Sequence, residues 1–155
     1  FHYLHHEAGG APYANRAEVG ERLLAAAGST GIAQTLMPVL YAHDNFGGTP
    51  PTIGQRRFIN DVNGYAGIVE SLLKTARGTV TQRVGIAPHS LRAVTPAQLN
   101  AAVELADTLE RRPLPRAVLP RIVLKSPKIT RRLTTEWFAM RVNQRYTRCM
   151  AKTQR

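Results

Sequence analysis

The amino-acid sequence predicts an α/β fold, in which apolar strands alternate with amphipathic helices and form a parallel sheet. Helical spacing of apolar residues recurs in separate segments along the chain. The segments between them are continuously apolar, which is typical of strands buried on both faces. Strand and helix follow one another in strict order, as in repeated βα units. At 155 residues, the chain is too short for a complete eightfold β/α barrel, which needs roughly 200 residues.

The first predicted helix covers residues 19–27. Asn15 is a favourable N-cap residue, and Glu18 follows three positions later, as in a capping box. Glycines at positions 28 and 31 predict its end. One helical face would be formed by Val19, Leu23 and Ala27.

A strand is predicted over residues 32–41, where the apolar run of residues 36–40 ends in polar residues. Pro38 weakens this prediction, because proline has no N–H to donate to a neighbouring strand. Glycines and prolines within residues 42–54 predict a long loop after the strand.

A second helix is predicted from residue 58 to a point near Gly78, followed by a strand over residues 79–87. The apolar face of that helix would be Phe58, Val62, Tyr65, Val69 and Leu72. Thr95 begins the last predicted helix, with proline at the first helical position and Gln98 completing a capping box.

The basic charge is confined to the last part of the chain. Residues 1–110 contain 8 Lys or Arg and 9 Asp or Glu, so their net charge is −1. Residues 111–155 contain 13 basic residues and one acid, Glu136, a net charge of +12. No helical or strand period is present there. The expected division is therefore a partial α/β domain over residues 1–111 and an irregular basic tail over residues 112–155.

Functional side chains are expected in the loops after the strands, because ligands of parallel α/β folds bind at the carboxyl ends of the strands. Three loops are rich in suitable groups: Tyr3, His5 and His6; His43, Asn45, Gln55, Arg56 and Arg57; and His89, Ser90 and Arg92. A histidine at a strand end is more often structural than catalytic. In a short loop, His89 and Arg92 could together hold a carboxylate.

Several motifs in order resemble the formimidoylglutamate deiminase family of the amidohydrolase superfamily. They are FHYLHH at residues 1–6, LMPVLYAHDNFGG at 36–48, GQRRF at 54–58 and APHSLRAVTPAQL at 87–99. The resemblance covers residues 1 to about 106 and implies a fragment of a metal-dependent (β/α)8 barrel of the TIM type. That fragment would comprise about three units, the second to the fourth.

The resemblance implies hydrolysis of N-formimidoyl-L-glutamate to N-formyl-L-glutamate and ammonia, in histidine degradation in the cytoplasm. It assigns Tyr3, His89 and Arg92 to binding of the substrate's glutamyl part. His43, Phe46, Gln55 and Arg56 are weaker candidates that would shape the neighbouring loop. The intact enzyme would bind zinc or another divalent metal and could be a homodimer. The family's metal ligands and catalytic residues match no position of this chain, so the chain alone is expected to be inactive.

Two other functions are compatible with the sequence. The basic tail could bind nucleic acid, with Trp137, Phe138 and Tyr146 stacking on the bases. This is the less favoured interpretation. Alternatively, the chain could bind glutamate derivatives without hydrolysing them. A frameshift or a misjoined gene end would explain the abrupt loss of pattern after Arg112. No apolar run reaches the length of a membrane-spanning helix, and the single cysteine, Cys149, permits no internal disulfide.

Overall fold

The computed structural model describes residues 2–110. Its helices and strands alternate along the chain as the sequence predicts. The elements, in chain order, are α1 (Glu18–Thr30), β1 (Gln34–Leu36), β2 (Val39–Leu40), the 3-10 helix η1 (Ile53–Gln55), α2 (Val62–Thr75), β3 (Gln82–Val84), β4 (Ala87–Pro88) and α3 (Pro96–Glu110). The proposed basic tail and its aromatic residues lie outside the described residues.

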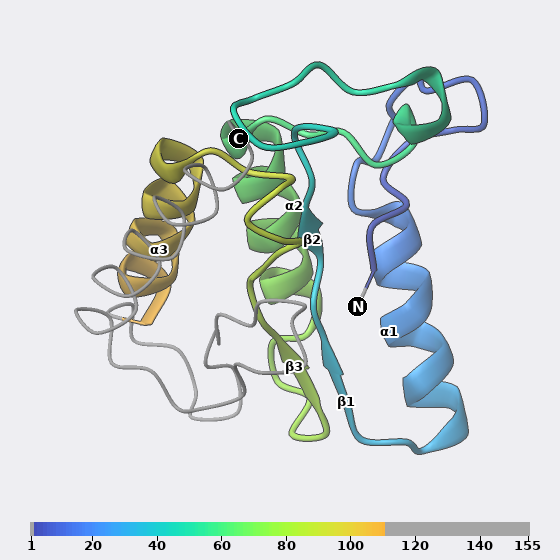
Figure 1. Ribbon diagram of the computed structural model, residues 1–155. Helices are drawn as coiled ribbons and strands as arrows, with labels where there is room; N and C mark the ends of the chain where they lie inside the picture. Colours follow the sequence, from blue (N-terminus) through green and yellow to red (C-terminus); the bar gives the residue numbers. More distant parts are fainter. Residues whose placement is uncertain (1, 111–155) are drawn as a thin grey trace.

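The strands pair in parallel, which confirms the predicted α/β class. β1 pairs with β3, and β2 continues the same strand to pair with β4. On the other side, a parallel bridge joins His2 to Pro38, where the His2 N–H donates to the Met37 carbonyl at 3.0 Å. Consecutive βα units thus place their strands side by side. The carboxyl ends of these strands meet at one edge, where the loop of residues 42–54 arches across (Figure 1).

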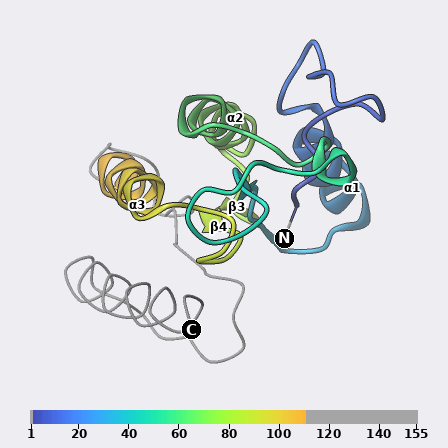
Figure 2. The ribbon, with the colours of Figure 1, turned by 45° about the horizontal axis from the view of Figure 1, so that its top comes forward.

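The three helices cover one face of the strands, and Figure 2 shows them in an arc around the sheet. Between the two layers lies a single apolar core, because each helix turns its buried stripe toward the strands. Its fully buried side chains include Leu24, Leu40, Tyr65, Ile68, Val84 and Ile86. This packing places the polar residues that follow each strand at the edge of the core.

Helix boundaries differ from the predictions where side chains make local hydrogen bonds to the backbone. The predicted N-cap Asn15 instead accepts a hydrogen bond from the Ala17 N–H, and α1 begins three residues later without a side-chain cap. Gly28 lies inside α1, and Gly31 ends it in the left-handed conformation that favours glycine. Asp61 caps α2 through the Gly64 N–H, so Phe58 lies before the helix and not on its buried face.

The hydroxyl of Tyr65 completes the sheet where the strands are interrupted. Tyr65 is fully buried in α2, and its hydroxyl donates to the Pro38 carbonyl and accepts from the Ala87 N–H, each at 3.0 Å. Pro38 lies between β1 and β2, and Ala87 is the first residue of β4 on the adjacent strand. The hydroxyl therefore replaces one direct strand-to-strand hydrogen bond. Burial raises the pKa of this phenol, which keeps it protonated as a donor.

Two helical glycines allow a test of the α1–α2 packing. A Cβ at Gly20 would lie 2.7 and 2.9 Å from the two Cδ atoms of the fully buried Leu72, whereas one at Gly67 would meet no atom within 4 Å. We expect Gly20→Ala to lower the free energy of unfolding by about 1–3 kcal/mol through overpacking. Gly67→Ala should raise it by about 0.5–1 kcal/mol, because alanine favours helix. Urea unfolding of both variants would measure these effects, and a stabilising Gly20→Ala would contradict the close packing.

Candidate functional site

Aromatic side chains from three loops meet at the carboxyl ends of the strands. The Tyr3 ring lies edge-on to Phe58, at 5.0 Å between centroids, and edge-on to the His89 imidazole, at 6.2 Å. Tyr41 lies 4.5 Å from His89 and 5.8 Å from Phe58. These four residues, Tyr3, Tyr41, Phe58 and His89, form the aromatic cluster. The structure thus brings together two of the three predicted substrate-binding residues.

His89 is held in place through both its backbone and its side chain. It directly follows β4, and its N–H donates to the Leu40 carbonyl at 2.9 Å. Its Nδ1 is hydrogen-bonded to the Ser90 hydroxyl at 3.2 Å. Arg92 lies in the turn that begins at Ser90, where the Ala93 N–H donates to the Ser90 carbonyl, and its side chain is exposed. The third predicted residue is therefore in the turn adjoining the aromatic cluster.

Gln55 connects η1 to the aromatic cluster. Its side-chain amide donates to the Tyr41 hydroxyl at 3.0 Å and to the Asp44 carboxylate at 2.6 Å. Its carbonyl oxygen accepts from the Thr52 N–H at 2.8 Å, which completes a capping box. Gln55 was a weaker candidate in the sequence, and its contacts show that it holds the loop after β2 against η1.

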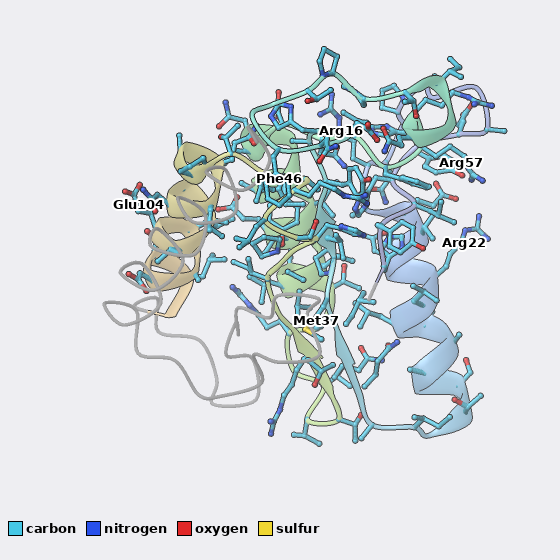
Figure 3. The ribbon with its side chains drawn as sticks, in the orientation of Figure 1. Arg16, Arg22, Met37, Phe46, Arg57 and Glu104 are labelled. Atoms are coloured by element: carbon cyan, nitrogen blue, oxygen red, sulfur yellow. The ribbon has the colours of Figure 1, made fainter. Side chains whose placement is uncertain are left out.

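The other weaker candidates in this loop region, Arg56, His43 and Phe46, differ in their hydrogen bonds. Arg56 donates to the Ala8 and Ile53 carbonyls, each at 2.8 Å, so it ties η1 to the N-terminal segment. His43 is half-buried, and its Nε2 has no hydrogen-bond partner among the described residues. The Phe46 N–H donates to the Asn45 side chain at 2.9 Å. Figure 3 shows Phe46 and Arg57 toward the end of the molecule where the strands terminate.

His5 and His6 serve the structure of the N-terminal segment. His5 Nε2 donates to the Val39 carbonyl at 3.1 Å, and His6 Nε2 donates to the Ile59 carbonyl at 2.6 Å. The Nδ1 atom of each ring is buried, and neither Nδ1 has a hydrogen-bond partner among the described residues. The two histidines contact different segments, as expected for adjacent residues in extended backbone.

Burial makes the His5 imidazole a weak base. His5 is 1% exposed, and its ring centroid lies 4.8 Å from that of the buried His2. Burial, with a smaller contribution from the neighbouring His2, lowers the pKa of His5 from 6.5 to about 4. Burial also lowers the pKa of His2 to about 4. Both rings are consequently neutral at pH 7.

The described residues do not fit the zinc site that the family resemblance implies. Within residues 2–110, no three His, Cys, Asp or Glu side chains are grouped so that they could hold a metal ion. His2 and His5 are neighbours, but the free Nδ1 atoms of His5 and His6 have no carboxylate or third imidazole grouped with them. We therefore derive no reaction step through a metal in this part of the chain.

Sequence reasoning missed two members of the aromatic cluster. The spacing of Phe58 from Val62 fits a helix and predicts a place on its apolar face, and only the cap at Asp61 excludes Phe58 from α2. Tyr41 was treated as the end of a strand. Its place directly after an apolar strand run is a signal that could have marked it, because that position reaches the ligand-binding edge of a parallel sheet.

Comparison with known proteins identifies relatives of this fold. The chain is 46% identical over 99 residues to the formimidoylglutamate deiminase of Pseudomonas aeruginosa, a match that covers 64% of this chain and 22% of the relative. The resemblance to formimidoylglutamate deiminase is confirmed. The crystal structure of an amidohydrolase from Brucella melitensis matches with a TM-score of 0.67 and 50% identity, over 69% of this chain and 24% of that one. Both deiminase and amidohydrolase are hydrolase names, and this chain spans about a quarter or less of either relative.

A second similarity begins within the described fold. Residues 90–152 match the family described as "Protein of unknown function (DUF1615)". The uncharacterized protein YaiW of Escherichia coli is 60% identical over 47 residues, which are 30% of this chain and 13% of that protein. The DUF1615 match covers most of the region beyond Arg112, where the sequence shows no deiminase pattern.

None of the helices within residues 2–110 is sufficiently long and apolar to cross a bilayer.

Proposed function

We propose that residues 2–110 bind the glutamyl part of N-formimidoyl-L-glutamate in the manner of a formimidoylglutamate deiminase. The carrying observation is the contact between Tyr3 and His89 at the strand ends, with Arg92 in the adjoining turn. The 46% identity to a formimidoylglutamate deiminase supports this substrate. The corresponding reaction is hydrolysis to N-formyl-L-glutamate and ammonia, as part of histidine degradation.

The chemistry of the three residues suits a glutamyl group. The Arg92 guanidinium can donate two parallel hydrogen bonds to a carboxylate, which gives both charge and orientation. Tyr3 and His89 carry hydroxyl and imidazole groups that can donate to further substrate oxygens. The aromatic rings around them would exclude water and so strengthen these polar contacts. The described residues thereby account for binding and orientation of the substrate.

Turnover is not expected from the described residues alone. Among them there is no grouped ligand set for a metal, and the resemblance puts zinc ligands and catalytic residues at positions that this chain does not match. We propose that the chain by itself binds N-formimidoyl-L-glutamate without releasing ammonia. The βα units present correspond to the second to fourth of a TIM-type barrel. In the intact enzyme, which would be cytoplasmic and could be a homodimer, the zinc ligands would come from residues outside this chain.

Replacing Arg92 tests this proposal. We expect Arg92→Ala to weaken binding of N-formimidoyl-L-glutamate by about 10- to 100-fold, because a charge-assisted hydrogen-bond pair is lost. Isothermal titration calorimetry of the full chain would measure this change. Arg77→Ala is the matched control, since Arg77 is also an exposed arginine but lies between α2 and β3, at the other end of the strands. Equal affinities of wild type and Arg92→Ala would contradict the assignment.

We also propose that the chain divides near residue 111 into a deiminase-like part and a separate basic segment over residues 112–155. The charge difference between the two parts supports this division, and the DUF1615 match, which begins at residue 90, covers most of the second part. The nucleotide sequence of the locus, translated in all three frames from about codon 105, tests it. Deiminase-like sequence in another frame would indicate a frameshift, and an intact DUF1615 reading frame would indicate joined genes.

A further inference from the structure

The ring of Tyr41 contacts two other members of the aromatic cluster, Phe58 and His89. Tyr41 follows β2 directly and is 5% exposed, and a parallel bridge joins it to Ile59. The Asn60 N–H donates to its carbonyl at 3.0 Å. Its ring is 4.5 Å from the His89 imidazole, at an interplanar angle of 54°. Among the rings of the cluster, Tyr41 makes the shortest centroid contact with His89.

The orientation of the Gln55 amide is set by its partners. A carboxylate such as that of Asp44 can only accept hydrogen bonds, so the side-chain nitrogen of Gln55 must face it. The carbonyl oxygen of Gln55 then faces the Thr52 N–H. The second amide hydrogen is directed at the Tyr41 hydroxyl. Reversing the amide would place two oxygens against each other at Asp44 and two N–H groups together at Thr52.

We propose that Gln55 is a positioning residue, which fixes the His89 imidazole by holding the ring of Tyr41. The continuous chain of contacts runs from the Gln55 amide to the Tyr41 hydroxyl and from the Tyr41 ring to His89. A fixed tyrosine ring restricts rotation of the imidazole beside it, because aromatic pairs prefer defined offset or edge geometries. The value of this positioning for ligand affinity rests on the proposed function, whereas its effect on the His89 ring does not.

Nuclear magnetic resonance of the full chain tests the proposal in the absence of ligand. The ring protons of His89 should change chemical shift in Tyr41→Leu, where the neighbouring ring is lost. Gln55→Ala and Tyr41→Phe should change them in the same direction by smaller amounts, because each removes the hydrogen bond between these two residues. Adding Tyr41→Phe to Gln55→Ala should cause no further change, since Tyr41 and Gln55 act on His89 through one hydrogen bond.

Gln98→Ala is the matched control. Gln98 also accepts a backbone hydrogen bond in a capping box, from the Thr95 N–H at 2.9 Å, but this capping box lies at the start of α3 and not in η1. It should leave the His89 resonances as in the wild type. Unchanged His89 resonances in both Gln55→Ala and Tyr41→Phe would overturn the proposal. Because Tyr41→Phe preserves the ring, it provides the same test if Gln55→Ala does not fold.

Titration with N-formimidoyl-L-glutamate then separates positioning from the proposed function. Gln55→Ala should bind about 2- to 10-fold more weakly than the wild type, the effect of one hydrogen bond. Weaker binding without a His89 shift would assign Gln55 another role and overturn positioning. If the wild type does not bind the compound, the proposed function fails, but the His89 resonances still decide whether Gln55 positions that ring.

Discussion

The free energy of unfolding of this protein is expected to decrease as the pH is lowered from 7 to 4. His5 and His2 have a pKa of about 4 in the folded protein, against 6.5 for an unperturbed histidine. Between these values the unfolded chain binds protons that the folded protein does not, so acid favours unfolding. The contribution of the two neutral histidines to the free energy of unfolding is complete above pH 6.5 and is lost as the pH falls toward 4. For His5 alone the loss amounts to about 3 kcal/mol.

The physical reason is that protonation of His5 would place a charge on a buried nitrogen without an acceptor. Its Nδ1 has no hydrogen-bond partner among the described residues, and the adjacent His2 ring would carry the same sign of charge. Chemical denaturation at pH 7, 6, 5 and 4 would measure the effect. His5→Gln is the informative variant, because a glutamine amide can donate to the Val39 carbonyl but does not titrate.

We expect His5→Gln to have a flatter dependence of unfolding free energy on pH than the wild type, and the His2→Gln/His5→Gln double variant a flatter one still. Carboxylates contribute to acid unfolding equally in all three proteins, so the differences between the proteins isolate the histidines. Identical pH dependence in the wild type and His5→Gln would show that the buried imidazole is protonated without penalty.

Tyr65→Phe is expected to lower the free energy of unfolding by about 2–4 kcal/mol, because it leaves two buried backbone groups unpaired. Those groups are the Pro38 carbonyl and the Ala87 N–H, which the hydroxyl joins across the interrupted sheet. Phenylalanine preserves the ring and its packing in the core, so the loss reports the hydroxyl alone. Urea unfolding followed by circular dichroism would measure it.

Tyr13→Phe is the matched control for that experiment. Tyr13 is half-buried, and its hydroxyl accepts a long hydrogen bond, 3.5 Å, from Arg57. Its removal should change the free energy of unfolding by about 0.5 kcal/mol or less. Similar losses in the two variants would mean that the Tyr65 hydroxyl does not bridge the strands.

Local sequence determined the elements whose ends depend on neighbouring residues. Thr95 and Gln98 predict the start of α3 and form the expected reciprocal capping bonds, because both partners lie within one helical turn. The alternation of apolar strand runs with helical stripes likewise predicts the parallel α/β class. A strand buried on both faces is apolar throughout, whereas a helix buried on one side has apolar residues only at helical spacing. The motifs at residues 1–6, 36–48, 54–58 and 87–99 carry the resemblance to formimidoylglutamate deiminase.

Tertiary structure alone decided where distant residues meet. Pro38 interrupts the strand as its missing N–H suggests, but the hydroxyl that completes the sheet comes from Tyr65, 27 residues away. Phe58 fits the helical period and nevertheless lies in the aromatic cluster. The contact of Gln55 with Tyr41 spans 14 residues of loop and strand. Spacing along a chain reports which face a residue occupies within one element, whereas such contacts depend on how separate elements pack.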